Sequence, residues 1–459
     1  MLICNPFFTL NFIAKMQILA LRYLFLLISF CLSFNVAFTQ QTLLQSGPMT
    51  GYSSMREVMI WVQTKEAAEV YVKYWEDGKE SDKVNSKAIS TESEKAFVAH
   101  IPIALLEPGK KYEYEVYINK KKCIFEYPLK FQTQTLWQWR TDPPAFSFAL
   151  GSCTYVNEDP YDRPGTPYGA NYEIFTSIYE KQPDFMLWLG DNTYLREVDW
   201  DSRSGILHRY THTRSLKEMQ PLLGSVHNYA VWDDHDYGPN NAERSYAFKD
   251  ETLEAFKLFW ANPNYELGPG GTIGSFAWQD VEFFLLDNRY FRNENSHANE
   301  EPTILGQAQI NWLFDALKFS RASFKFVVMG GQFVNPVATD EAYATFGKER
   351  QYIIDKIREL RIRGVVFLSG DRHFSELSKL QENDRVYPLY DFTVSPLTSG
   401  PYEPKENNYL RVENTLYAKR NFGMMHIEGE RNKRKLTMQI YDVAGEMVWE
   451  ESILQEDLR

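Results

Sequence analysis

From residue 146 onward the sequence alternates short apolar runs with helical stretches, and this alternation limits the possible folds more than any other feature. The apolar runs have the length of buried strands. They occupy residues 146–150, 185–189, 230–232, 283–286, 326–329 and 365–369. Helical patterns lie between them, for instance at 172–181 and 250–260, and the chain ends in a hairpin formed by residues 435–442 and 446–453. We therefore expect an α/β (α+β) fold with helices and sheets layered in the order α-β-β-α.

The preceding part of the chain reads as a succession of short strands and turns. Runs at 59–63 and 68–74 are followed by Leu106, a Pro-Gly turn and the sequence Tyr112-x-Tyr114-x-Val116. This arrangement resembles the tyrosine corner of fibronectin type III and immunoglobulin-like sandwiches. Two prolines at 143 and 144 mark a boundary. We expect a β-sandwich at 41–140 and a layered domain at 145–459.

The first forty residues are typical of a signal peptide. Lys15 and Arg22 are their only charged residues, and an apolar run at 24–32 has the length of a signal-peptide core. We expect residues 1–40 to be removed and the mature chain to be exported, periplasmic or secreted, with no stable membrane span. The alternative is a retained anchor, because the hydrophobic stretch approaches the ~18 residues that cross a bilayer. Cys4 and Cys31 lie in this segment, which leaves Cys123 and Cys153, between which a disulfide is formally possible.

Composition excludes several classes of protein. The chain has 459 residues, of which 44% are hydrophobic and 24% charged, which excludes disorder, collagen and coiled coil. Its formal net charge of −12 opposes binding to a nucleic acid, and we expect no nucleic-acid surface. If the substrate carries a phosphate, cations other than surface Lys and Arg would therefore have to bind it. Oligomeric state is left open.

Polar residues suited to metal binding follow four of the apolar runs. These segments are Gly151-Ser152-Cys153, Gly190-Asp191-Asn192-Thr193-Tyr194, Trp232-Asp233-Asp234-His235-Asp236 and Ser369-Gly370-Asp371-Arg372-His373. Taken singly, each has a simpler explanation as a turn, a solvated loop or a small buried residue. Ligands of α/β sheets gather beyond the carboxyl ends of strands, so together these segments bring carboxylates, a thiol, a phenol and two imidazoles to one edge. Carboxylates at that density repel one another unless cations lie between them. A metal site is therefore predicted.

In this order the four motifs resemble the PhoD-like (alkaline phosphatase D) family of metallophosphatases. The likeness covers about residues 146–396, with further matches at 287–290 and 305–313, and an N-terminal immunoglobulin-like domain also occurs in that family. Gly-Asp-x-x-Tyr is also similar to purple acid phosphatases, but those carry Gly-Asn-His-Glu and Gly-His-x-His where this chain has Asp-Asp-His-Asp and Gly-Asp-Arg-His.

The resemblance implies a role for each motif residue in binding two metal ions. Asp191 would bridge them. Cys153, Tyr194 and His373 would complete a site for a trivalent ion, and thiolate and phenolate suit Fe³⁺. A harder second ion, Ca²⁺ in the family pattern, would be held by Asp234, Asp371 and Asn241. Other binuclear phosphatases add a histidine after a middle strand, whereas residues 329–333 of this chain contain none.

Three further residues are implied in catalysis. His235 would lie near the leaving group rather than on a metal, and Arg289 and Arg372 would contact phosphate oxygens. The expected function is an exported metal-dependent phosphoric ester hydrolase, a phosphomonoesterase or phosphodiesterase, that acts on a small phosphate ester through a metal-activated water.

Two other functions compete with this hypothesis. One is a non-catalytic surface-binding protein, and the other is a serine hydrolase using Ser152 or Ser369, for which no Gly-x-Ser-x-Gly elbow is present in the domain. Among the remaining histidines, His208 and His212 are spaced four apart on an expected helix, and His297 lies in a polar insert where it would line the substrate entrance.

Overall fold

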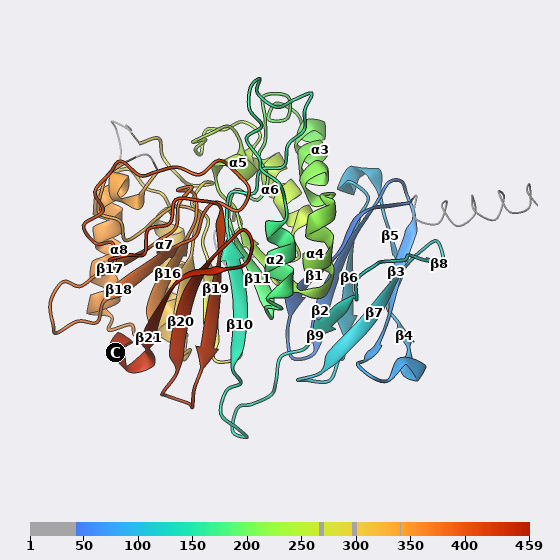
Figure 1. Ribbon diagram of the computed structural model, residues 1–459, viewed down its shortest axis with the longest axis horizontal. Coiled ribbons are helices and arrows are strands. Elements are labelled where there is room, and N and C mark those ends of the chain that lie inside the picture. Colours follow the sequence, from blue (N-terminus) through green and yellow to red (C-terminus); the bar gives the residue numbers. More distant parts are fainter. Residues whose placement is uncertain (1–42, 266–269, 296–300, 340) are drawn as a thin grey trace, which may run out of the picture.

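The computed structural model describes residues 43–265, 270–295, 301–339 and 341–459 (Figure 1). The expected signal peptide at 1–40 and His297 lie outside these residues. Within them, no helix has both the length and the apolar character needed to cross a bilayer.

A nine-stranded sheet runs through the molecule and contains strands from both ends of the chain. Its order is β21-β20-β19-β10-β11-β12-β1-β2-β6. The bounds are β1 (Leu44–Ser53), β2 (Glu57–Thr64), β6 (Val98–Ala104), β10 (Phe146–Gly151), β11 (Phe185–Leu189), β12 (His227–Val231), β19 (Asn421–Glu428), β20 (Lys435–Asp442) and β21 (Met447–Leu454). The central strands β10, β11 and β12 are parallel, so their carboxyl ends lie at the same edge.

A six-stranded sheet faces it, in the order β13-β14-β15-β16-β18-β17. Its strands are β13 (Gly274–Trp278), β14 (Val281–Leu285), β15 (Lys325–Val328), β16 (Val365–Ser369), β17 (Glu376–Leu380) and β18 (Leu389–Thr393). Strands β14, β15, β16 and β18 are parallel, so this sheet also has several carboxyl ends at one edge. Aromatic side chains fill the space between the sheets. The Phe148 and Phe283 rings, for example, meet edge to face with centroids 5.3 Å apart.

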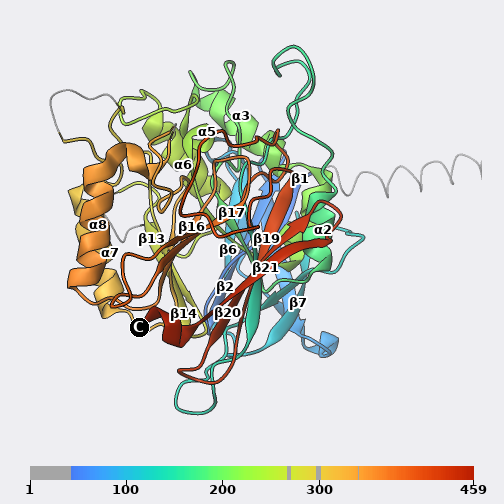
Figure 2. The same cartoon turned by 60° about the vertical axis from the view of Figure 1, so that its left-hand side comes forward.

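Helices cover the outer faces of both sheets (Figures 1 and 2). Those on the nine-stranded sheet are α2 (Ile174–Glu180), α3 (Arg203–Arg214), α4 (Gln220–Ser225) and α6 (Lys249–Phe259), and those on the six-stranded sheet are α7 (Gln307–Phe319) and α8 (Gly347–Glu359). A short helix, α5 (Asp234–Tyr237), follows β12 directly. The order of layers is α-β-β-α, which confirms the expected fold class.

The N-terminal strands form a sandwich that shares the nine-stranded sheet. Strands β1, β2 and β6 pack against a second sheet, made of β3 (Glu69–Glu76), β4 (Val84–Asn85), β5 (Ile89–Ser90), β7 (Lys111–Ile118), β8 (Lys121–Lys122) and β9 (Lys130–Gln132). The tyrosine corner is present, since the Glu107 amide donates to the Tyr112 hydroxyl at 3.1 Å. Strand β1 pairs with β12 in parallel, Thr50 opposite His227, so the sandwich extends the sheet of the layered part. The division into 41–140 and 145–459 stays a prediction.

Buried hydrogen bonds join the sandwich to the layered part. The Tyr114 hydroxyl donates to the Gly224 carbonyl at 2.8 Å, and the Trp61 indole donates to the Leu258 carbonyl at 2.8 Å. The Tyr114 and Trp61 side chains are buried, so a substitution that removes either donor leaves the facing carbonyl without that partner while the two parts stay packed together.

We predict that Tyr114→Phe lowers the free energy of unfolding by about 1–3 kcal/mol, because it leaves the buried Gly224 carbonyl without this donor. Tyr117→Phe is a matched control, since Tyr117 lies on the same strand but its hydroxyl donates to Glu115 on the half-exposed face. We expect the control to change stability by about 0.5 kcal/mol or less. Chemical denaturation of both variants provides the measurement, and equal losses would contradict the structural role of the Tyr114 bond.

Candidate metal centre

The four predicted motifs meet where the strands end. Cys153 follows β10, Asp191 and Tyr194 follow β11, Asp234 opens α5 after β12, and Asp371 follows β16. Two facing sheets thus contribute to one cluster, as the parallel strand directions require.

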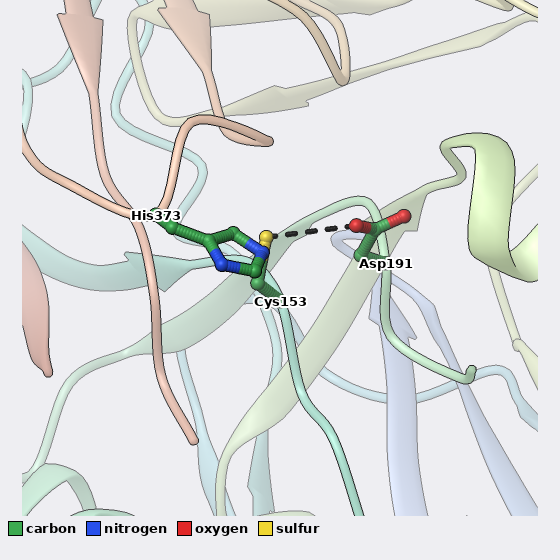
Figure 3. Close-up of side chains that lie close together, drawn as sticks. All are labelled: Cys153, Asp191 and His373. Carbon is green, nitrogen blue, oxygen red and sulfur yellow. Dashed lines mark hydrogen bonds between the residues drawn. The ribbon is translucent and has the colours of Figure 1, made fainter. Parts of the chain in front are cut away.

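The first donor group contains Cys153, Asp191 and His373, whose ligand atoms all lie within 4.8 Å of one another (Figure 3). The Cys153 sulfur is 3.6 Å from Asp191 Oδ2. Tyr194 joins them, because its hydroxyl donates to Asp191 Oδ2 at 3.1 Å and lies 3.3 Å from His373 Nε2. His373 Nδ1 donates to the Gly400 carbonyl at 2.6 Å, which leaves the Nε2 lone pair directed at the cluster.

Two further donor groups adjoin the first. One comprises Asp191, Asp234 and His235, and the other Asp233, Asp234 and Asp371, each with donor atoms within 4.8 Å. Asp191 and Asp234 each belong to two groups, so the three groups form one continuous cluster. Asn241 was expected to be a metal ligand. It contacts the cluster through its backbone, because its amide N–H, rather than its side chain, donates to Asp234 Oδ2 at 2.7 Å.

The electrostatics of this cluster fit cations. Burial, followed by repulsion from Asp234 and Asp233, raises the pKa of Asp191 well above its ordinary value. Burial also raises the pKa of Asp371, and Asp233 and Glu341 add to that rise. The pKa of the Cys153 thiol is raised by burial and then by Asp191 and Asp371. Burial and mutual repulsion therefore oppose ionisation of these donors, and a positive ion among them would favour their ionised forms.

Five of the predicted ligands have left-handed backbone conformations. The φ angles are 60° for Cys153, 52° for Asp191, 61° for Asn241, 67° for Asp371 and 57° for His373. A non-glycine residue there costs roughly 1 kcal/mol or more, so the surrounding structure must hold each in place. Gly190, with φ of 96°, shows how close the packing is, since a Cβ at this position would lie 2.7 Å from the Asp233 Cβ.

The two predicted arginines both lie at the cluster but are already engaged. Arg289 is fully buried, with Nε on Asp233 and its Nη atoms on Glu341. The expectation that Arg289 contacts phosphate oxygens is therefore corrected, because its side chain faces carboxylates and has no exposed surface. Arg372 donates to Glu406 and lines a cavity of about 520 Å³ beside Asp371 and His373.

His235 lies on the wall of a second cavity, of about 240 Å³. Its ring stacks on Tyr194 with centroids 4.2 Å apart. Burial lowers its pKa, although the neighbouring Asp234 carboxylate acts in the opposite direction. The sequence expectation kept His235 off the metals, yet its ring nitrogen is within reach of a cation held by Asp191 and Asp234.

Sequence reasoning missed several residues of the centre. Asp233 stands inside a quoted motif, but only the structure shows that its buried Oδ2 has no hydrogen-bond partner among the described residues. Glu341 has no local signal, and Tyr168, whose hydroxyl is 3.1 Å from His373 Nδ1, comes from a distant loop. Within the segment 329–333, position 330 has no room for a histidine, because a Cβ on Gly330 would lie 2.3 Å from the Asp233 Cγ.

The other sequence candidates lie apart from this cluster. His208 is paired with Glu158 at 2.8 Å, and His212 Nε2 donates to the Asn157 carbonyl at 2.9 Å. Both histidines therefore anchor the loop that contains Asn157 and Glu158. Cys123 and Cys153 are both free and buried, and the formally possible disulfide is not formed.

Comparison with known proteins gives consistent matches over most of the chain. Residues 148–439 match the PhoD-like phosphatase family, and residues 41–136 match a domain of unknown function, DUF7800. Alkaline phosphatase D of Bacillus subtilis (strain 168) is 24% identical over 357 residues, which are 66% of this chain and 59% of that protein's length. A solved structure titled "Structure of PhoD" superposes with a TM-score of 0.73 at 17% identity, covering 91% of this chain and 92% of the other, and so has the same fold.

We predict that Asp191→Asn sharply lowers the metal content of the purified protein, because Asp191 contributes to two donor groups at once. Asp184→Asn is the matched control, since Asp184 lies at the opposite end of β11 and accepts from Gln132 and Ser147. Elemental analysis after dialysis against a metal buffer measures the effect. Unchanged stoichiometry in Asp191→Asn would contradict the metal centre.

Proposed function

Since the chain belongs to the PhoD-like phosphatase family, we propose that it is an exported metal-dependent hydrolase that cleaves small phosphoric esters, whether monoesters or diesters. The observation that carries the proposal is the single cluster formed by Cys153, Asp191, Tyr194, Asp234 and His373. Thiol, phenol, imidazole and carboxylates at one edge of two sheets form a mixed soft and hard donor set. The run of apolar residues at 24–32 supports the export part of the proposal.

The donor chemistry divides between two ions. Cys153, Tyr194, His373 and Asp191 suit Fe³⁺, whereas the oxygen donors around Asp234 and Asp371 suit Ca²⁺. Asn241 would contribute to the second site from the loop after α5. When bound, these ions would polarise the phosphoryl group and lower the pKa of a water molecule toward neutrality.

The chain's own residues bind and orient the ester. Arg372 lines the larger cavity together with Asp371 and His373, which supports contact with a phosphoryl oxygen. Arg289 is a positioning residue that does not contact the ester. Its guanidinium pairs with Asp233 and so fixes the loop that carries Asp234. Burial of these pairs keeps the cluster in one geometry.

His235 is proposed to hold the proton for the departing oxygen. It lines the smaller cavity, and its Nδ1 has no hydrogen-bond partner among the described residues. Stacking on Tyr194 fixes the plane of its ring beside the cluster. A leaving group in this cavity would therefore meet the imidazole edge.

The iron assignment predicts a visible colour. Phenolate bound to ferric iron gives a broad charge-transfer band, so the iron-loaded protein should absorb visible light and Tyr194→Phe should lose the band. Tyr155→Phe is a suitable control, because Tyr155 lies next to Tyr194, with ring centroids 5.1 Å apart, but outside the donor groups. Colourless wild-type protein without iron would exclude this assignment and leave other metals possible.

The role of His235 predicts a dependence on the leaving group. A general acid contributes roughly 10²–10⁴-fold and matters most when the leaving group is poor. His235→Ala should therefore lose much more kcat/KM on an alkyl phosphate than on a nitrophenyl phosphate while keeping its metal content. Equal losses on both esters would rule out the acid role, and a fall in metal content would indicate that His235 instead supports the metal centre.

A further inference from the structure

The cavity beside His235 has a wall that the proposed mechanism does not use. Its lining includes Tyr155, Asp162, Arg163, Tyr168, Tyr194, Arg196 and His235. His235 and Tyr194 form the side toward the metal cluster. Two further tyrosines, Tyr155 and Tyr168, and Arg196 form much of the rest, so the cavity combines an aromatic surface with a cationic group.

Arg196 is held firmly in this wall. Only 6% of its surface is exposed. Its Nε donates to the Tyr155 hydroxyl at 3.1 Å. Its guanidinium carbon lies 4.7 Å from the centroid of the Tyr155 ring and 5.6 Å from that of Tyr194. Such a planar group between aromatic rings is preorganised for an anion.

Arg196 also lacks the partner that most buried arginines of this protein have. Arg209, Arg289, Arg292, Arg372 and Arg434 each have a carboxylate within 4.0 Å. Within the described ranges no carboxylate lies that close to Arg196, and its two Nη atoms have no hydrogen-bond partner there. Arg214 also has no carboxylate, but it donates to the Phe259 carbonyl and lines none of these cavities.

The other charges of the cavity are already engaged. Asp162 accepts hydrogen bonds from the Tyr155 hydroxyl and from the Glu158 amide. Arg163 forms an ion pair with Glu197 at 2.8 Å. Buried charges are normally paired, whereas Arg196 has no carboxylate partner among the described residues and is therefore the group in this cavity that can accept an anion.

We propose that Arg196 binds a second negative charge on the leaving-group side of the substrate, so that the enzyme prefers small phosphate esters that carry an additional carboxylate or phosphate. This inference rests on the proposed function, because it takes His235 as the residue facing the leaving group. The reacting phosphoryl group lies over the metal cluster, whereas Arg196 borders the same cavity as His235. The anion that Arg196 holds is therefore carried by the leaving group.

The size of the cavity restricts that leaving group. At about 240 Å³ it is below the roughly 300–1,000 Å³ of most small-molecule sites. It suits a group of a few carbon atoms. The tyrosine rings would cover the carbon chain while the guanidinium pairs with its acidic end.

The test compares 3-phosphoglycerate with glycerol 3-phosphate, which differ in a carboxylate against a hydroxymethyl group. The metal-loaded wild-type protein should show a kcat/KM about 10- to 100-fold higher for 3-phosphoglycerate, the range expected for a hydrogen bond to a charged group. Arg196→Met should reduce this ratio to about one, and Arg196→Lys should restore part of it. Arg203→Met, in which an exposed arginine paired with Glu254 is removed, is the control and should keep the wild-type ratio.

A binding measurement makes the test independent of turnover and of variant folding. Glycerate should raise the Tm of the metal-loaded wild-type protein more than glycerol does at the same concentration, because a ligand of the native state stabilises it. Equal kcat/KM values for the two esters, or a ratio unchanged in Arg196→Met, would overturn the role of Arg196 while leaving the phosphatase function intact. Absence of hydrolysis of every phosphate ester would instead overturn the proposed function, and the glycerate comparison, made on both the wild-type protein and Arg196→Met, would then decide whether Arg196 binds an anion.

Discussion

Repulsion among buried carboxylates at one edge of the two sheets is the constraint on which the rest of the centre depends. Asp191 lies close to Asp234, and Asp234 lies close to Asp371. Burial and the neighbouring carboxylates raise the pKa of Asp191 and of Asp371, so ionising either of them costs free energy. Cations remove that penalty only if the donors stay where they are. The left-handed backbone at several ligands and the close packing of Gly190 and Gly330 on Asp233 keep them there.

The layered architecture supplies this geometry from ordinary strands. Because β10, β11 and β12 run parallel to one another in one sheet and β16 runs parallel to β15 and β18 in the other, segments separated by more than 200 residues end at one place. Each strand is followed by a different type of donor residue, so the cluster combines a soft thiol with hard carboxylate oxygens. The buried ion pairs of Arg289 hold the loop after β12 against the loop that carries Glu341.

Much of the fold could be predicted because its strands are continuous apolar runs. The predicted bounds at 185–189 and 365–369 agree with β11 and β16, and the hairpin and the tyrosine corner are present. The predicted ligands are brought together because strand ends of a parallel sheet meet. Residues such as Glu341, Tyr168 and Arg196 could not be found, since their roles come from contacts between distant loops. For the same reason the sequence did not reveal that Arg289 is surrounded by carboxylates, since Asp233 and Glu341 are distant from it along the chain.

The pairing of β1 with β12 has a consequence for how the protein can be divided. In the intact chain β12 lies between β11 and β1, and the sandwich closes that side of the sheet. Without residues 43–135, β12 would become an open edge strand with unpaired amides and carbonyls, which is a template for intermolecular β-pairing. The sandwich thus protects the layered part from aggregation, whatever else it binds, and the two parts should not be expected to remain soluble when made separately.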